Sequence, residues 1–488
     1  MRSLPPFIKI LPFVIVGILL GQVVTLRWWV AAIGGAICSL AAYTLRTRRE
    51  GSLYIACAIL LWTLATSSLR TPQSVPPPTA PRNYHATITS YPTISGRWQR
   101  CDATLRLNNK SEKIILRADT SITLAIGERG VVSGYLNPLP EGSYGSLMGR
   151  RGYVGELWAT TRADWRPTAE EPKQGLAILG RRMQHKMVER IERLHLGESE
   201  EAIVEAMLTG WRGEITPSLR ESYSRAGTSH LLAISGLHIG LVAMAVWWLG
   251  WLLPLTSRRG HIVRNITATL ILILYAFISG LSPSAVRATI IFCTAQMALA
   301  YGTSKSSLNL LAGAASVMLL VNPNNLFDIS FQLSFAAVVG IAIGYEPLAE
   351  FFGAGSTKRW LKTLLGVVIV GLCSTIATLP LVSHTFSVVS LVGIFLNPFV
   401  ILTAEIIVLL GLIWVTLPLE VLQPIMSTLI GGTATLQNRL VEGAAALEWS
   451  ALEVQMPAWM VALCYLLMAG GVVVASLRKD KKEWKVRS

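Results

Sequence analysis

Charged residues are scarce in this 488-residue sequence: they make up 15% of it, whereas soluble globular proteins carry about 25%. Apolar residues reach 52%, and the mean hydropathy is +0.50. This balance argues against a soluble, a disordered or a disulfide-built protein of this length. It predicts a chain that crosses a membrane many times and keeps enough polar sequence for one modest soluble domain.

Cysteine and histidine are also sparse. The six cysteines form no C-x-x-C motif, and the seven histidines include no i, i+4 pair. H-E-x-x-H, G-x-x-x-x-G-K-[ST] and G-x-S-x-G motifs are missing as well. These absences leave no basis for a zinc module or a disulfide framework. We therefore expect no metal site, no cofactor, no ATP hydrolysis and no nuclease activity of the chain's own.

Apolar runs of about 20 residues, the length that a helix needs to cross the hydrocarbon core, fall into two groups. The first group covers roughly 10–26, 28–45 and 53–69. The second group resumes at Ser229 and comprises 229–253, 263–279, 285–301, 307–321, 329–345, 363–382, 391–417, an uncertain 424–438, and 457–477. We expect Asn397-Pro398 to break the run 391–417, and the charged segment 436–455 to lie at the membrane interface.

The residues between the two groups have different periodicities. A proline-rich linker precedes short alternating stretches separated by turn residues, at 85–89, 104–107, 114–117, 121–126, 131–136 and 154–158. This alternation is typical of a small antiparallel β domain. Residues 173–226 show helical, amphipathic spacing instead, as in helices that lie on a membrane or pack on the β domain.

The predicted fold is therefore a polytopic α-helical membrane protein with an inserted small antiparallel β domain. Its predicted parts are N-terminal transmembrane helices at 1–70, the β domain at 71–170, amphipathic helices at 171–227, and a multi-span domain with a basic tail at 228–488.

The positions of the basic residues predict the orientation. Four basic clusters lie at 46–49, 258–264, 358–362 and 478–487, whereas the loops 279–284, 322–328 and 383–390 contain no Lys or Arg. If both termini are cytoplasmic, all four clusters are cytoplasmic and the β domain lies outside. Topology thus accounts for much of the net charge of +15. The mild basic excess within the β domain is compatible with a polyanion but does not require one.

One polar segment opens the span that begins at residue 229, where polar groups cost free energy unless they have partners or line a wet cavity. It contains His230, Ser235, Gly236 and His238, and the Ser-Gly pair favours a kink. The segment is interpreted as the lining of a pathway or as a protonatable group. The alternative is a pair of interfacial histidines that bond to neighbouring helices.

Further polar residues stand at the outer ends of later spans. Ser282 or Ser284 can cap a helix that Pro283 opens. Arg287 then lies about one turn inside, where it either reaches out to headgroups or meets an anion. Gln332 and Ser334 can bond between helices. The isolated Glu405 is a possible partner of Arg287.

These segments carry a family resemblance. Residues 201–243, EAIVEAMLTGWRGEITPSLRESYSRAGTSHLLAISGLHIGLVA, resemble the signature of the ComEC competence family, the inner-membrane DNA channels of bacterial transformation. Three later blocks are similar to those of the family and occur in the same order: GLSPSAVRA at 280–288, Asn322-Pro323 with DISFQLSF at 328–335, and TLPL at 378–381 with Asn397-Pro398. GERGVVSGYLNP at 127–138 and Arg151-Gly152-Tyr153 resemble the family's outer OB-like domain.

The resemblance implies an inner-membrane channel that passes single-stranded DNA into the cytoplasm. It also implies an extracytoplasmic DNA receptor and a cytoplasmic DNA motor or binding protein as partners. The residues that it points to are His230, Ser235, Gly236, His238, Ser282, Pro283, Ser284, Arg287, Gln332, Ser334 and Arg212. None of them is expected to be catalytic.

Two departures from the family pattern matter. Many members show an acidic–basic pair where this chain has Trp211-Arg212. A metallo-β-lactamase-like domain is not recognised in this sequence, so a separate nuclease would degrade the second strand. Two other functions stay open. One is the transport of another substrate on the same fold, and the other is a membrane-embedded hydrolase that uses Ser235 or His238.

Aromatic residues of the β domain could stack on bases, although packing in the core or at a membrane interface is the simpler reading. They are Tyr84, Tyr91, Trp98, Tyr135, Tyr153 and Trp158.

The predicted topology can be tested by thiol labelling. A cysteine introduced at Asn108, in a chain without Cys101, should react with a membrane-impermeant thiol reagent in intact cells or after outer-membrane permeabilisation. Labelling only after lysis of the inner membrane would reverse the orientation.

Overall fold

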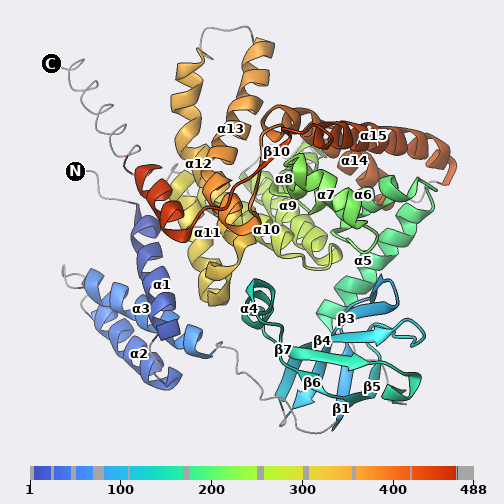
Figure 1. Cartoon of the computed structure of the whole chain (residues 1–488). Coiled ribbons are helices and arrows are strands. Elements are labelled where there is room, and N and C mark those ends of the chain that lie inside the picture. Colours follow the sequence, from blue (N-terminus) through green and yellow to red (C-terminus); the bar gives the residue numbers. More distant parts are fainter. Residues whose placement is uncertain are drawn as a thin grey trace.

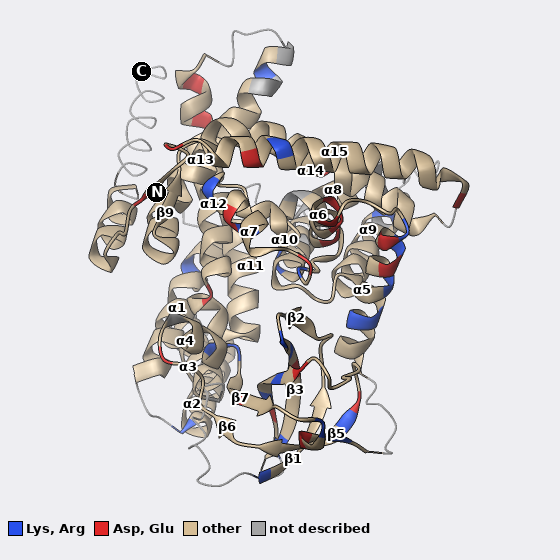
Figure 2. Cartoon of the chain, turned by 45° about the vertical axis from the view of Figure 1, so that its right-hand side comes forward, with Lys and Arg blue, Asp and Glu red and all other residues tan. Residues whose placement is uncertain are grey.

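The computed structural model describes residues 5–23, 27–44, 51–69, 82–107, 110–168, 175–249, 258–300, 307–353, 359–417 and 420–468, together with Gly470. A curled β sheet lies below a large helical region, and α5 leads from the sheet into that region (Figure 1). Lys and Arg are frequent on the sheet and along α5, whereas most of the helical region carries few charges (Figure 2). The arrangement agrees with the sequence pattern of apolar spans around one polar insert.

The three N-terminal spans form the helices α1 (Pro6–Val23), α2 (Trp28–Thr44) and α3 (Gly51–Leu69). Small residues let α1 and α3 approach closely, as they often do between membrane helices. A Cβ atom on Gly21 would lie 2.7 Å from the Ser67 Cβ. At the other end of α1, the Phe7 N–H donates to the Asn309 Oδ1 of α11 at 2.9 Å. The N-terminal helices are thereby attached to the larger helical region.

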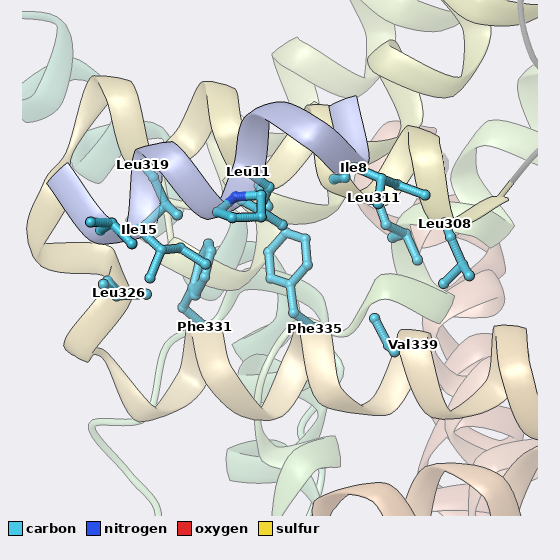
Figure 3. A pocket seen from close by; sticks show the side chains of 14 residues that line it. Ile8, Leu11, Ile15, Leu308, Leu311, Leu319, Leu326, Phe331, Phe335 and Val339 are labelled. Carbon is cyan, nitrogen blue, oxygen red and sulfur yellow. The ribbon is translucent and has the colours of Figure 1, made fainter. Parts of the chain in front are cut away.

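An apolar cavity of about 630 Å³ lies between α1, α11 and α12. Leu11 and Ile15 of α1 face Phe331 and Phe335 of α12 across it (Figure 3). Its lining consists of aliphatic and aromatic side chains and one proline. This part of the interface between the N-terminal helices and the larger helical region is therefore held by apolar contacts.

The sheet has the strand order β6-β7-β4-β3-β1-β5-β8, with β2 paired to β3. Only Tyr135 separates β5 from β6, yet β5 pairs with β1 and β6 pairs with β7. The chain bends at this residue and so joins the two sides of the curled sheet. The strands are β1 (Arg82–Ile88), β2 (Thr93–Ser95), β3 (Trp98–Leu107), β4 (Lys110–Asp119), β5 (Arg129–Gly134), β6 (Leu136–Asn137), β7 (Tyr153–Ala159) and β8 (Trp165–Pro167).

The core of the sheet follows the alternation seen in the sequence, because successive side chains of a strand point to opposite faces. In β3, Cys101, Ala103 and Leu105 are buried against the other strands. Cys101 is a free thiol. The stretch 121–126 is not a strand, contrary to expectation. Its residues Ile122, Leu124 and Ile126 are buried all the same, so the apolar alternation there serves a turn-rich loop rather than a hydrogen-bonded ladder.

The short helix α4 (Ser143–Arg150) was not predicted and lies between the sheet and the helical region (Figure 1). Then follow α5 (Leu176–Glu192), α6 (Glu198–Thr209) and α7 (Pro217–Arg225). The expected helical periodicity is confirmed for this stretch. α6 is not a surface helix, however, because every residue from Ala202 to Thr209 is buried between α5, α14 and α15.

Ten further elements follow: α8 (Gly236–Leu249), α9 (Arg258–Ile278), α10 (Pro283–Ala300), α11 (Ser307–Val321), α12 (Ile329–Phe351), α13 (Arg359–Phe386), β9 (Val388–Ser390), α14 (Gly393–Thr416), α15 (Gln423–Ala445) and β10 (Ala451–Glu453). The 3₁₀ turns η2 (Ser229–Leu232), η3 (Pro323–Phe327) and η4 (Glu420–Leu422) precede α8, α12 and α15. Among the described residues, four helices are long and apolar enough to span a membrane: Pro6–Val23, Ile329–Phe351, Leu365–Phe386 and Gly393–Thr416.

Three expected boundaries are wrong. α14 continues through Pro398, which lies near the start of the helix, so the proline removes only one backbone hydrogen bond. α15 is one helix and does not divide into a span at 424–438 and an interfacial segment from 436. The helix expected from Ser229 begins at Gly236. The last expected span, 457–477, is helical over Ala458–Met468, and most of its remainder lies outside the described residues.

Buried polar side chains join α7, α14 and α15. Thr403 donates to the Gln437 Oε1, the Gln437 amide donates to the Tyr223 hydroxyl, and that hydroxyl donates to the Asn438 Oδ1, each at 3.0 Å. Mutual satisfaction lowers the cost of burying these groups. The network fixes the register of α14 and α15 against α7.

Glu205 of α6 is a less well satisfied buried group. It is 1% exposed, and its Oε2 lacks a hydrogen-bond partner among the described residues. Burial, together with the charges of the nearby Glu201, Glu192 and Glu214, raises the pKa of its carboxyl to about 8.

This pKa shift predicts a pH-dependent stability. Between the ordinary carboxyl pKa of 4.5 and about 8, the folded chain keeps a proton that the unfolded chain loses. The free energy of unfolding therefore falls as the pH rises through that window. Glu205→Gln, which is always neutral, should be more stable than the parent at pH 8 by a few kcal/mol, since one pKa unit corresponds to about 1.4 kcal/mol.

The measurement is thermal unfolding of the detergent-solubilised chain at pH 5, 6.5 and 8. The gain should shrink toward pH 5, because that pH lies close to 4.5, below which the unfolded chain also keeps the proton. Glu198→Gln, at an exposed position of the same helix, is the matched control. If the gain in stability is equal at all three pH values, Glu205 is not protonated in the folded chain as inferred.

Candidate nucleic-acid interface

The loop before α8 has a backbone that requires glycine. Gly227 has a φ of 73°, which only glycine adopts readily. A Cβ atom at this position would lie 2.7 Å from the Ser390 Cβ, and one on Gly393 would lie 2.9 Å from the Ala226 carbonyl oxygen. The loop is therefore packed directly on the first turn of α14 and on β9.

Ser235 and His238 cap the N-terminus of α8 reciprocally. The His238 N–H donates to the Ser235 Oγ at 3.2 Å, and the Ser235 N–H donates to the His238 Nδ1 at 3.3 Å. The expected kink at Ser235-Gly236 is thus a helix start. Because Nδ1 accepts a hydrogen bond, the neutral ring carries its proton on Nε2. His238 is fully buried, and this Nε2 has no partner among the described residues.

The other expected residues of this loop are accessible. His230 lies in η2 and is exposed, as is Gly236. Among the described residues, and apart from the adjoining backbone of α8, no atom lies within 4 Å of a Cβ built on Gly236. The structure thus brings Ser235 and His238 together and leaves open space beside Gly236.

Three segments that are separate in the sequence meet at Gly210. A Cβ atom on this glycine would lie 3.4 Å from Ile234 and 3.7 Å from Ser282. The neighbouring carbonyl groups hold the loop in place. Thr209 O accepts from the Gln184 side chain at 2.7 Å, and Leu208 O accepts from the Tyr275 hydroxyl at 2.9 Å. The end of α6, the loop before α8 and the start of α10 therefore form one structural unit.

The start of α10 agrees with the sequence in part. Ser282 caps it, since its Oγ accepts from the Ala285 N–H at 3.4 Å, and Pro283 is its first residue, with Ser284 beside it. Arg287 is buried, with 8% of its surface exposed. Its electrostatic neighbours are Asp328 and Arg151. Glu405 instead lies near enough to Tyr275 for its charge to affect the tyrosine hydroxyl group. The suggested pairing of Arg287 with Glu405 is therefore not found.

Asp328 joins the segment at 322–335 to the β domain. Its Oδ1 accepts from the Ser330 N–H at 2.8 Å and caps α12, while its Oδ2 accepts from Arg151 at 3.1 Å. The Gln332 side chain donates to the Leu326 carbonyl at 2.9 Å and so gives this carbonyl group of η3 a hydrogen-bond partner. Ser334 follows within α12. Burial raises the pKa of Asp328, but Arg151 and the Ser330 hydrogen bond outweigh it, so the net shift is downward.

Two further contacts reinforce this junction. The Asn324 amide donates to the Arg150 carbonyl at 2.9 Å, and the Arg150 guanidinium lies 4.5 Å from the centre of the Phe327 ring. The end of α4 is thus docked on η3. This agrees with the position of α4 below α11 and α12 in Figure 1.

Arginines gather around this junction. Arg212, in the loop after α6, is close enough to Arg220 and Arg151 for their charges to lower its pKa, in the same direction as its burial does. We call Arg151, Arg212, Arg220 and Arg287 the arginine cluster. Asp328 is bonded to Arg151 at 3.1 Å and lies near enough to Arg287 for their charges to interact. The cluster therefore carries a net positive charge where the β domain meets the helices.

A second feature lies on the outer face of β3, β4 and β7, and it combines two tryptophans with two arginines that are paired with Asp119 and Glu156. Trp98 and Trp158 form an edge-to-face pair with ring centres 5.1 Å apart. Arg97 lies over Trp98 at 5.9 Å, and Arg117 lies over Trp158 at 5.1 Å. We call these four residues the aromatic strip. The sequence indicated both tryptophans, but it contains no local pattern that relates them to these arginines.

The remaining aromatic residues separate into different environments. Tyr84 is in the core of the sheet, Tyr135 is exposed, and Tyr153 is half-buried. Tyr91 stacks on His185 of α5 at 4.1 Å between ring centres, and its ring centre lies 6.4 Å from that of Trp211. This contact joins the β domain to the loop that carries Arg212.

In the described part of the chain, no group of three His, Cys, Asp or Glu side chains is arranged to hold a metal ion.

Comparison with known proteins gives a consistent picture. A family model described as Competence protein matches residues 207–478. ComE operon protein 3 of Bacillus subtilis is 29% identical over 196 residues, which cover 40% of this chain and 24% of that protein. Competence protein ComA of Neisseria gonorrhoeae is 26% identical over 204 residues, covering 39% and 28%. YcaI of Escherichia coli, an uncharacterised protein, is 24% identical over 211 residues, covering 40% and 26%.

The chain therefore spans only about a quarter of the length of these relatives. No solved structure matches it. The matched region includes the loop before α8, the start of α10 and the Asp328 junction.

Proposed function

The chain belongs to the ComEC competence family, and we propose that it is the channel through which single-stranded DNA crosses the cytoplasmic membrane during natural transformation. Family membership supports a role in competence and DNA uptake. The channel activity and its substrate are our proposal.

The observation that carries the proposal is the arginine cluster at the meeting point of three family segments. A polyanion can cross a hydrocarbon layer only along a wet and preferably electropositive path. Arg287 and Arg212 come from the helical region, and Arg151 comes from the β domain. Positive charge is thus concentrated where a strand would pass from one region to the other.

The β domain supports the proposal through its topology. Four strands run in the order β1-β3-β4-β7, and the bent β5–β6 segment connects the two ends of this row, since β5 pairs with β1 and β6 pairs with β7. We propose an OB-like barrel, a fold that binds oligonucleotides on the face of its second and third strands. β3 and β4 occupy those places, and they carry Trp98 and Arg117 of the aromatic strip.

The proposed setting is the bacterial inner membrane, crossed several times, with both termini in the cytoplasm and the β domain outside. An extracytoplasmic receptor would deliver DNA and a cytoplasmic motor or binding protein would draw it in. A separate nuclease would degrade the other strand, and the chain itself would have no catalytic role.

The hydrolase alternative is less well supported by the geometry. In a Ser–His pair the ring nitrogen must accept the hydroxyl proton. Here the His238 Nδ1 accepts from the Ser235 backbone, and the Ser235 Oγ accepts from the His238 backbone. Both groups are engaged in capping α8.

Transformation assays test the function. In a transformable host whose only competence-family gene encodes this chain, deletion should abolish transformation while DNA still reaches the cell exterior. Gly236→Leu should lower transformation because its side chain fills open space beside the loop, and His238→Ala because it removes the α8 cap. Both variants are compared with the parent at equal membrane abundance. Normal transformation by both would remove this loop from the path, and normal transformation by the deletion strain would overturn the function.

Binding of single-stranded DNA tests the aromatic strip. Trp98→Leu and Trp158→Leu in the purified chain should each weaken binding at least about fivefold, because stacking contributes about 1–3 kcal/mol per base. Trp449→Leu, at a 54% exposed tryptophan outside the β domain, should leave the Kd unchanged. Equal weakening by all three variants would contradict a localised strip.

A further inference from the structure

Arg287 is a buried cation that is only partly compensated. Its residue surface is 8% exposed, and its Nε has no hydrogen-bond partner among the described residues. A buried charge is costly unless it is paired and hydrogen-bonded. Arginine also presents a planar fork of donors that fits two oxygens of one anion. The position therefore favours an additional anionic oxygen ligand.

The anion now beside Arg287 is shared. Asp328 attracts both Arg287 and Arg151, but its Oδ2 is bonded to Arg151 and its Oδ1 to the Ser330 N–H. One carboxylate thus serves two guanidinium groups, which leaves one positive charge in excess. The side chains of Arg151 and Asp328 are 40% and 16% exposed, so the pair can be reached by a ligand.

The contact between Arg151 and Asp328 is also part of the docking of α4. Arg150 packs on Phe327, and its carbonyl accepts from Asn324. These neighbouring contacts do not involve the Asp328 carboxylate. Arg151 can therefore exchange one anionic oxygen for another while α4 stays in place.

We propose that Arg287 and Arg151 form a binding site for one backbone phosphodiester of the entering strand, and that the Asp328 carboxylate occupies this site until the phosphate displaces it. The identity of the ligand rests on the proposed function, whereas the site itself rests on the contacts above. Asp328 acts as an internal competitor. It lowers the cost of burying Arg287 in the empty chain, and it prevents a phosphate from being held too tightly to move on.

Asp328→Asn separates the two roles of this residue. Asparagine is as good a helix N-cap as aspartate, so the bond to Ser330 can be kept while the competing charge is lost. Arg287→Gln removes the buried cation. Glu420→Gln is the matched control, because Glu420 is paired with Arg190 and Arg193 at η4, outside the arginine cluster.

The experiment measures binding of a labelled single-stranded oligonucleotide to the full chain in lipid-free micelles over a series of salt concentrations. Asp328→Asn should tighten binding at least about threefold. Arg287→Gln should weaken it and reduce the slope of log Kd against log salt by about 0.7, the contribution of one phosphate contact on a single strand. Glu420→Gln should match the parent. Should Arg287→Gln fail to accumulate, Asp328→Asn alone decides.

If the parent binds the oligonucleotide but Asp328→Asn binds no tighter, the site is wrong while the proposed function stands. A strand of uncharged methylphosphonates should lose the difference between Asp328→Asn and the parent, and persistence of that difference would also overturn the site. Micelles that contain phosphatidylglycerol test a lipid phosphate as occupant. If this lipid abolishes oligonucleotide binding by Asp328→Asn but not by Arg287→Gln, the ligand of the site is a lipid phosphate and not the DNA strand.

Inorganic phosphate distinguishes the site from the function. Phosphate should raise the melting temperature of Asp328→Asn more than that of the parent, and should not raise that of Arg287→Gln. If phosphate has this effect but deletion of the gene leaves transformation intact, the anion site is supported and its ligand is not the DNA strand. Absence of any phosphate effect in Asp328→Asn would overturn the site.

Discussion

The ion pair between Arg151 and Asp328 links the β domain to the helices at the start of α12. Asp328 caps the long apolar helix α12, bonds to the β domain and compensates the buried Arg287. The cap needs only a side-chain oxygen, whereas the bond to Arg151 and the compensation of Arg287 need a carboxylate. The start of α12, the ionic link to the β domain and the compensation of Arg287 therefore meet at one side chain.

Close backbone approach is the second constraint. Gly227 and Gly393 lie where a side chain would collide with a neighbouring segment, and Gly210 has a φ of 74°, which favours glycine. These contacts bring the loop before α8 against α14 and against the start of α10. Polar side chains then hold these closely packed segments together. They are the capping pair of Ser235 and His238 and the hydrogen-bond donors Gln184 and Tyr275.

Periodicity in the sequence predicted most helices and the main strands, because each of these elements has a local apolar pattern. It failed where tertiary contacts decide. α6 reads as amphipathic but is enclosed by α14 and α15, and Pro398 reads as a break but lies near a helix start. The neighbours of Arg287 could not be predicted either. Arg151 and Asp328 are 177 positions apart, and no local pattern relates such residues. The resemblance to a family indicated the segments 201–243 and 280–288, but it did not indicate that they meet at Gly210.

The bend at Tyr135 has a consequence for the order of folding. The sheet closes only when β7 has paired with β4 and β6, and β7 lies near the end of the domain. A nascent chain therefore cannot complete the sheet until residues up to about 159 are available, whatever has formed earlier. Closure is a non-local step, and steps of this kind are slow compared with helix formation. During synthesis, the first three helices would be complete while the sheet that follows them is still open.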